Sequence, residues 1–388
     1  MDFPLVWAEV DLEAIAHNVR ELRRITNPVA HLMAVVKANA YGHGVIEVTR
    51  KALENGADSL GVARIEEGIE LRKAGVQQSI LIFGYTPPAL AHKLIEFDLT
   101  QTLWSYTTAQ ALSDVAVYSN KQIKVHLKVD TGMGRLGLLP DCRRPPVTEQ
   151  NLIGNAVCEA HSISSLAGLE LEGVYTHFAT ADSSVKTYAG KQFEIFVDFL
   201  NDLRRAGINP PLCHAANSAA IIDMPETHLD MVRAGIAVYG LYPSDQVNKG
   251  RIALKPAMTL KSKIIHLKKV PSGFNVSYGC TYQTPKSTII ASIPVGYADG
   301  FSRLLSSRGH MLVHGHRAPI VGRVCMDQTM LDVGHIPDVN LEDEVVIFGR
   351  QGYESITVDE IAVSLSTINY EIVSALTARV PIIYPKHS

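Results

Sequence analysis

The sequence lacks paired cysteines, a surplus of charge of one sign and any long apolar run. Its five cysteines are scattered, and no two of them are spaced as a CxxC pair. That arrangement argues against a zinc ribbon or a disulfide framework and favours reduced thiols, so we expect a cytoplasmic protein. The formal net charge of −3 comes without a basic stripe, so nucleic acid is not an expected partner.

Membrane and secretory signals are missing as well. No apolar run approaches the roughly 20 residues that a helix needs to span a bilayer. The first residues, MDFPL, contain neither the basic nor the apolar part of a signal peptide. We therefore expect no membrane partner.

The chain does contain enough apolar sequence for two domains. Of its 388 residues, 46% are hydrophobic and 19% are charged. Strand-like and helix-like patterns alternate over residues 31–239, which predicts an α/β fold with a (β/α)8 barrel of the TIM type at 12–243. An open, doubly wound sheet is the alternative. The predicted barrel strands are 31–37, 59–62, 79–84, 100–104, 122–130, 171–178, 212–217 and 231–239.

A mostly-β domain is predicted at residues 244–388, joined by a strand from residues 1–11. A helix is expected there only at 357–366, where Thr357 and Glu360 have the spacing of a capping box. Gly, Pro and Asp turns separate the strand-like segments, which are 258–270, 288–295, 311–313, 320–324, 330–333 and 344–348.

Lys37 ends a continuous apolar segment and is followed at once by a turn that contains Gly42 and Gly44. A cation at the end of a buried strand is costly unless it has a partner or a chemical role. One such role is covalent, because a lysine amine forms an imine with a carbonyl. The alternative is a lysine that extends its amine to water.

The other predicted strand ends also carry polar side chains. In a barrel enzyme the chemistry lies at the carboxyl ends of the strands, so these side chains are expected to meet at one mouth. The residues at or after the strand ends are Lys37, Tyr41, Asp130, Arg135, His177, Asn217, Ser218, Arg233, Gly235 and Ile236.

The last two of these strand ends predict the cofactor. Loops after the seventh and eighth strands commonly bind phosphate in barrels, and Ser218, Gly235 and Ile236 offer small side chains and backbone N–H groups. Phosphate beside an imine-forming lysine indicates pyridoxal 5′-phosphate (PLP). Arg233 would then face the pyridine nitrogen, and because a guanidinium donates hydrogen bonds and cannot accept one, it would keep that nitrogen unprotonated.

Two further patterns are rejected. Residues 132–137 fit GxGxxG after a strand, but Pro140, Pro145 and Pro146 follow, so the helix that a dinucleotide fingerprint needs is not expected. His314 and His316 lack the cysteine or carboxylate spacing of a zinc site. We expect a hairpin turn there and no metal.

Several segments together resemble the bacterial alanine racemases. The similarity runs nearly end to end and in the right order. Its segments are AVVKANAYGHG (34–44), KVDTGMGRLG (128–137), YTHFATAD (175–182), HAANSAA (214–220), VSYG (276–279), GYADG (296–300), CMD (325–327) and TINYE (367–371).

The resemblance implies a PLP-dependent racemase that interconverts L-alanine and D-alanine and supplies D-alanine for peptidoglycan. It implies a homodimer whose active sites lie at the subunit interface. By the resemblance, Lys37 binds PLP covalently and Tyr278 of the partner subunit is the second base. The other implied cofactor residues are Tyr41, His177, His214, Asn217, Ser218, Arg233, Gly235, Ile236 and Tyr370, and the implied substrate residues are Arg135, Met326 and Tyr297.

The family comparison leaves some points open. Lys128 matches a lysine that is carbamylated in some members. Many members have an arginine after the Arg-Val-Pro near the C-terminus, whereas here Ile382 follows. Serine or a broader range of amino acids is the alternative substrate. A PLP-dependent decarboxylase, or a PLP carrier without catalysis, is the alternative from another class.

Overall fold

The computed structural model describes residues 4–140 and 156–385 and divides them into two compact units. One unit contains Glu13–Ala40 and Val45–Pro256 and is called the barrel unit here. The other contains Met1–Leu12, Tyr41–Gly44 and Ala257–Ser388 and is called the β unit. Cys142, Pro145 and Pro146 lie outside the described residues.

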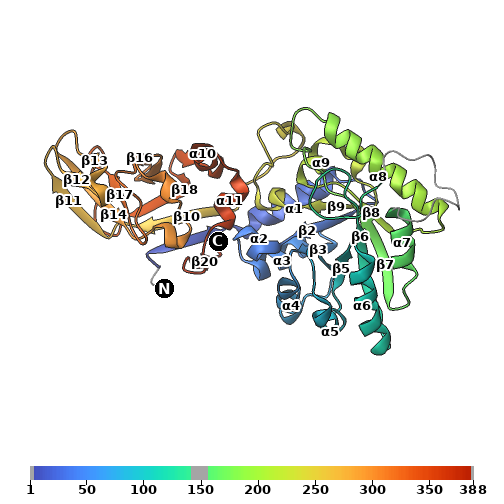
Figure 1. Cartoon of the computed structure of the whole chain (residues 1–388). Helices are drawn as coiled ribbons and strands as arrows, with labels where there is room; N and C mark the ends of the chain where they lie inside the picture. The colour runs from blue at the N-terminus through green and yellow to red at the C-terminus, as the bar shows by residue number, and fades with distance from the viewer. Residues whose placement is uncertain (1–3, 141–155, 386–388) are drawn as a thin grey trace. The chain divides into compact units, whose positions relative to one another are not determined.

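Eight parallel strands close into a barrel (Figure 1). Neighbouring strands pair in chain order, and the last strand pairs back with the first, Met33 lying beside Arg233. This closure confirms the predicted α/β barrel and excludes the open sheet. The strands are β2 (His31–Val35), β3 (Ser59–Val62), β4 (Ile80–Ile82), β5 (Thr100–Leu103), β6 (Ile123–Lys128), β7 (Leu169–Tyr175), β8 (Leu212–His214) and β9 (Met231–Ala234).

Amphipathic helices surround these strands. α8 buries Phe196, Phe199 and Leu203, which lie three or four residues apart and so share one face. Within the described ranges, no helix is both long enough and apolar enough to cross a bilayer. The helices are α1 (Leu12–Ile25), α3 (Val45–Glu54), α4 (Ile65–Lys73), α5 (Ala91–Glu96), α6 (Tyr106–Tyr118), α7 (Ala156–Ser164), α8 (Thr187–Arg205) and α9 (Ser218–Asp223).

Seven of the eight predicted barrel strands extend past the observed carboxyl ends, and three of them do so by three residues or more. These three strands stop at Tyr175, His214 and Ala234, before the predicted ends at 178, 217 and 239. After β9 the chain forms a short 3-10 helix, Ile236–Tyr239, whose side chains are all buried. Buried turns of this kind have the same continuous apolar pattern as a buried strand, and periodicity does not distinguish them.

The β unit is built on a seven-stranded sheet. Its main path runs β16–β15–β18–β10–β1–β20, and β19 pairs with β18. The N-terminal strand β1 pairs antiparallel with β10 along its whole length. These strands are β1 (Val6–Val10), β10 (Met258–Lys263), β15 (His310–Val313), β16 (His316–Pro319), β18 (Glu344–Gln351), β19 (Glu354–Ile356) and β20 (Ile382–Ile383).

The predicted strand at 258–270 is wrong, because it is two strands in two sheets. At Ile264 and Ile265 the backbone bonds to Asp343 and then to Ser292, so the chain leaves the large sheet for a three-stranded one. The order of that small sheet is β11–β14–β17, and a separate pair is β12–β13. Their bounds are β11 (His266–Val270), β12 (Asn275–Val276), β13 (Tyr282–Gln283), β14 (Thr288–Ile293) and β17 (Thr329–Asp332).

The hairpin expected at His314 is confirmed. His314 and Gly315 have φ values of 51° and 73° and join β15 to β16, as two-residue hairpin turns require. Among the described residues no group of three or more His, Cys, Asp or Glu side chains is arranged to hold a metal ion.

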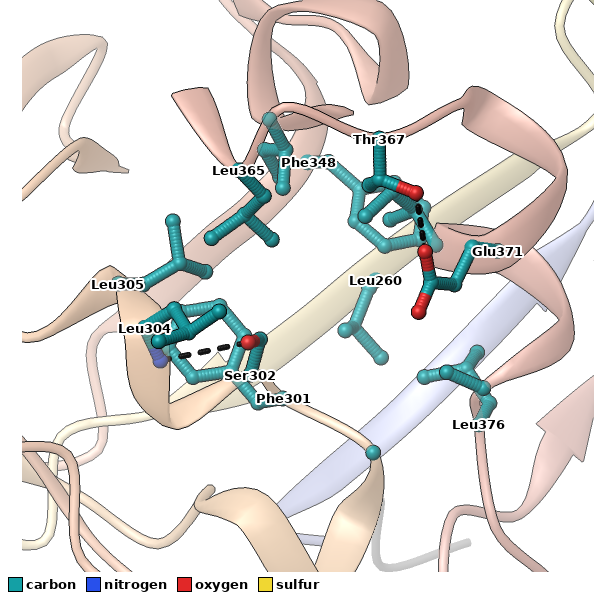
Figure 2. A pocket seen from close by; sticks show the side chains of 14 residues that line it. Leu260, Phe301, Ser302, Leu304, Leu305, Phe348, Leu365, Thr367, Glu371 and Leu376 are labelled. Atoms are coloured by element: carbon teal, nitrogen blue, oxygen red, sulfur yellow. Dashed lines mark hydrogen bonds between the residues drawn. The ribbon is translucent and has the colours of Figure 1, made fainter. Parts of the chain in front are cut away.

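Two helices cover part of the β unit. α10 (Val358–Ser364) begins where Thr357 accepts a hydrogen bond from the backbone N–H of Glu360, which is one half of the predicted capping box; the Glu360 carboxylate pairs with Arg317. α11 (Asn369–Ser374) was not predicted, because six residues are too short to show a helical period. An apolar pocket is lined by Leu260 and Phe348 of the sheet, by Leu365 at the end of α10 and by Glu371 of α11. Thr367, between the two helices, is hydrogen-bonded to Glu371 (Figure 2).

Candidate active site

Lys37 begins a left-handed turn at the carboxyl end of β2. Ala38, Asn39 and Ala40 all have φ and ψ near +50°. This region costs L-residues roughly 1–2 kcal/mol each, so such a run persists only where its surroundings hold it. The strain indicates that the direction of the chain after Lys37 is functionally constrained.

A carboxylate from the neighbouring βα unit holds this turn. Glu67 of α4 accepts a hydrogen bond from the Ala38 N–H at 2.6 Å, and its other oxygen accepts from the N–H groups of Ala63 and Arg64 at 2.7 and 3.0 Å. The Asn39 side chain accepts a further bond from Val45 at 2.8 Å. These contacts fix the position of Lys37.

The amine of Lys37 is in an environment that disfavours its charged form. Burial, followed by the positive charge of Arg135, lowers the pKa of Lys37, and Glu67 only partly opposes the shift. A lysine that readily loses its proton can act as a nucleophile or as a base.

Arg233 lies at the end of β9 and is almost fully buried, with 4% of its surface exposed. It donates to the carbonyls of Thr176 and Ala215 at 2.7 and 2.9 Å and to Nδ1 of His214 at 2.8 Å. It lies 3.3 Å from Nδ1 of His177. Among the described residues no carboxylate forms an ion pair with it, so every partner of this guanidinium is neutral.

Lys128, at the end of β6, is a second buried cation. Its Nζ lies 4.7 Å from the centre of the Tyr175 ring, and Arg233 lies 5.1 Å from the same ring. Burial, followed by the charges of Arg233 and Arg135, lowers the pKa of Lys128 to about 7. Both buried cations thus share a cation–π contact with the Tyr175 ring, which Arg233 adds to its hydrogen bonds.

His177 is surrounded by these cations. Burial and the charges of Arg233, Lys128, Arg135 and Lys37 hold its pKa well below the ordinary value. Among these residues, Lys37, Lys128 and Arg233 stand at or just after the carboxyl ends of β2, β6 and β9, and His177 follows β7. The convergence expected at the barrel mouth is therefore present for these side chains.

The segment after β6 presents Arg135. The Asp130 carboxylate accepts hydrogen bonds from the backbone N–H groups of Gly132, Met133, Gly134 and Arg135 at 2.8–3.1 Å. Burial raises the pKa of Asp130, but these four bonds outweigh it, so the net shift is downward. No helix opens in residues 131–140, which confirms the rejection of a dinucleotide fingerprint.

Ser218 links the last two loops of the barrel. Its hydroxyl oxygen accepts from the N–H groups of Gly235 and Ala237 at 2.8 and 3.4 Å, which leaves its own O–H to donate. Asn217 caps α9 by accepting from the N–H of Ala220 at 3.1 Å. The two loops are thus bonded together, and the Ser218 O–H remains as a donor to an anion.

The remaining predicted residues lie in the β unit. Tyr278 is 71% exposed and stands in a turn between β12 and β13. Tyr297 and Met326 belong to two loops that are bonded together, because Ala298 donates its N–H to the Met326 carbonyl at 3.0 Å. The rings of Tyr41 and Tyr370 lie 6.1 Å apart.

Two family models together cover nearly the whole chain. The N-terminal domain of alanine racemase matches residues 10–243, and its C-terminal domain matches residues 257–384. The chain belongs to the alanine racemase family. This membership confirms the resemblance found in the sequence.

Individual relatives agree with this assignment. An alanine racemase of Desulfosudis oleivorans is 54% identical over 381 residues, covering 97% of this chain and 96% of the relative. An alanine racemase structure from Clostridium difficile 630 has a TM-score of 0.90 at 40% identity, covering 99% of this chain and 97% of that one. A histidine racemase from Leuconostoc mesenteroides subsp. sake has a TM-score of 0.88 at 28% identity, covering 100% and 99%.

Three residues of this alanine racemase fold were missed as site residues. Glu67 holds the turn after Lys37, Tyr175 lies against the cations, and His126 lies 2.8 Å from His214. Glu67 stands three residues after Arg64 and accepts from its backbone N–H, but no local sequence pattern indicates its bond to Ala38. The other two residues stand inside the predicted strands 122–130 and 171–178, before the predicted ends at which site residues were sought.

Proposed function

We propose that this member of the alanine racemase family interconverts L-alanine and D-alanine with PLP as cofactor. The two proposed bases are Lys37 of one subunit and Tyr278 of the partner subunit. The observation that carries the proposal is the surroundings of Arg233. A buried guanidinium with only neutral partners, on the strand that pairs with β2, after which Lys37 follows, suits a ring nitrogen that accepts a hydrogen bond.

The residues of the barrel mouth fit PLP. Within the described residues the Arg233 Nε–H donates to no group, so it is available to a ring nitrogen. The Ser218 hydroxyl and the Ile236 N–H are the donors proposed for a phosphate, with the Gly235 N–H holding the Ser218 oxygen in place, and the family assigns Tyr41 and Tyr370 to the same group. When bound at Lys37, PLP supplies an electron-withdrawing ring that makes the α-proton of an amino acid acidic.

The residues of this chain then divide the remaining tasks. Within the described residues the Arg135 guanidinium forms no side-chain hydrogen bond or ion pair, and we assign it to the substrate carboxylate, together with the backbone at Met326. Tyr297 would line the entrance. Lys37 Nζ takes a proton from the α-carbon on one face, and Tyr278 Oη of the partner subunit delivers a proton on the other.

Two bases are needed because inversion requires opposite faces. A single base tends to return the proton to the face that it left. The amine of Lys37 and the phenol of Tyr278 are the candidates, and His177 would connect the phenol to Arg233. Tyr278 is largely exposed in one chain, and we therefore infer that a homodimer completes each site.

The alternatives differ in chemistry at the ring nitrogen or in substrate. A PLP-dependent decarboxylase typically places an acidic group there, whereas this chain places Arg233. A PLP carrier without catalysis needs neither the β unit nor Tyr278. A histidine racemase has nearly the same fold, so the fold alone does not fix the amino acid, and serine or a broader range stays the competing substrate.

Incubation with L-alanine and PLP tests the reaction directly. The expected result is a mixture of both enantiomers without release of CO2, and release of CO2 would instead identify a decarboxylase. A panel of L-amino acids under the same conditions measures selectivity. Faster inversion of serine or histidine than of alanine would overturn the proposed substrate.

Mixing two inactive variants tests the shared site. In a mixed dimer of Lys37→Ala and Tyr278→Phe subunits, one site keeps both native bases if they come from different chains. Random mixing of equal amounts should then restore about a quarter of the native activity. No recovery after unfolding and refolding together would show that both bases come from one chain.

We also place the protein in the cytoplasm. The cysteines in the described part of the chain, Cys158, Cys213, Cys280 and Cys325, are free thiols. Thiols persist in reducing compartments. Location of a tagged chain by cell fractionation tests this assignment.

A further inference from the structure

His126 lies inside the barrel, behind the groups that the proposed mechanism uses. Its side chain projects from β6 and is 3% exposed. Its Nδ1 is 2.8 Å from Nε2 of His214, and Nδ1 of His214 is 2.8 Å from Arg233. Two imidazoles and a guanidinium therefore form one buried chain.

The direction of every hydrogen bond in this chain follows from Arg233. A guanidinium has only donors, so Nδ1 of His214 must be the acceptor and carries no proton. The remaining proton of a neutral His214 is then on Nε2, which donates to Nδ1 of His126. His126 in turn carries its own proton on Nε2. If His214 carried both protons, its Nδ1–H and an N–H of Arg233 would be two donors facing each other at 2.8 Å.

The surroundings are built to hold these two rings. Gly173 of β7 leaves room for His126, because a Cβ at that position would stand 2.7 Å from the imidazole. The Tyr175 ring stacks on His214 at 4.7 Å with an interplanar angle of 9°. Tyr175 is itself fixed by a hydrogen bond of 3.1 Å to Thr102. Burial first, and then the charge of Arg233, lowers the pKa of both histidines, so both are neutral.

We infer that His126 is a positioning residue: it accepts from Nε2 of His214 and so keeps that ring in the tautomer and orientation in which it accepts from Arg233 and holds the guanidinium toward the cofactor. This inference rests on the proposed function for its effect on catalysis. The tautomer pattern itself does not depend on that function.

Neutron diffraction from crystals of the holoenzyme in heavy water tests the pattern. The expected map has deuterium on Nε2 of His126 and of His214 and none on Nδ1 of either. Deuterium on Nδ1 of His214, or of His126, overturns the inference. If the pattern is present but alanine is not racemised, the proposed function fails while the tautomer assignment stands.

Three variants test the effect on catalysis. His126→Leu removes the acceptor and should lower kcat about tenfold, as loss of tautomer-fixing partners does elsewhere, with KM changed by less than about twofold. His126→Asn places an amide oxygen near the position of Nδ1 and should restore kcat to within about threefold of the native value. His228→Leu is the control, a buried histidine of the same unit that contacts Asn27 and Ile221 and has no bond to Arg233.

The variants separate positioning from simple packing. If the leucine and asparagine variants of His126 lose the same activity, or if His228→Leu loses as much kcat as His126→Leu, the role is structural and the inference is wrong. If His126→Leu does not fold, the asparagine variant and the neutron map of the native enzyme still decide.

Discussion

The two candidate bases differ in how much of their surroundings one chain provides. Lys37 stands on a strained turn held by Glu67, and burial and Arg135 lower its pKa. Tyr278 is 71% exposed and lies between two strands of two residues each. The barrel thus supplies the contacts that hold Lys37, whereas Tyr278 lies exposed on the surface of the chain. Under the proposed function, a second copy of the chain must complete the site.

The largest expected effect comes from replacing Lys37. Lys37→Ala should lose at least about a thousandfold in racemase activity, because it removes both the cofactor attachment and one base. The absorbance of protein-bound PLP should disappear with it. Lys93→Ala is the control, since Lys93 pairs with Glu96 at 2.8 Å, lies 5.6 Å from the centre of the Phe97 ring and should leave both signals unchanged. Retained racemisation in Lys37→Ala would remove Lys37 from the mechanism.

Tyr278→Phe should lower racemisation by about a thousandfold while bound PLP keeps its absorbance. The phenol is exposed, so the fold should not change. If only one base is lost, solvent deuterium should still enter the α-position of one enantiomer, which mass spectrometry of each alanine enantiomer detects. Tyr353→Phe is the matched control, because Tyr353 is 99% exposed. Equal exchange into both enantiomers would contradict the two-base assignment.

The contrast between the two regions also decides what the sequence could predict. The barrel could be predicted from the sequence because buried parallel strands form continuous apolar runs, and the polar residues that follow these strands must meet at one mouth. Lys37, Arg135, His177 and Arg233 were found in this way. Tyr278 was found only through the family resemblance, since an exposed tyrosine in a turn has no pattern of its own.

Other features depended on contacts between distant residues. The left-handed turn after Lys37 requires Glu67, 30 positions later in the chain, and no local pattern connects the two. The division of residues 258–270 between two sheets depends on backbone bonds to Asp343 and Ser292. Local periodicity contains neither kind of information.

Gly42 tests whether the chain beyond the Lys37 turn is as constrained as the turn itself. In Gly42→Ala the new Cβ would stand 2.2 Å from the carbonyl oxygen of Val373, at a φ of +82°. We expect a loss of about 3 kcal/mol in the free energy of unfolding, measured in urea. Gly75→Ala has a similar φ of +91° and no atom within 4 Å, so it should lose only about 1 kcal/mol. Equal losses would show that backbone strain, not the collision, limits stability.

The smallest expected effect concerns Lys128 and depends on pH. Its pKa falls from 10.5 when unfolded to about 7 when folded, mainly through burial. Below about pH 7 the folded protein must hold a buried charge, and this penalty is relieved as pH rises from 7 to 10.5. Lys128→Met should therefore be more stable than the native protein at pH 6, by on the order of 1 kcal/mol, and the difference should shrink toward pH 10.

A carbamate on Lys128 would change this outcome. The modification replaces the cation with an anion beside Arg233 and Arg135, so the native protein would then be stabilised by the side chain that Lys128→Met removes. Native protein equilibrated with ¹³C-bicarbonate should in that case give a carbamate resonance that the variant lacks. A native protein without the resonance and less stable than the variant at pH 6 indicates an unmodified amine.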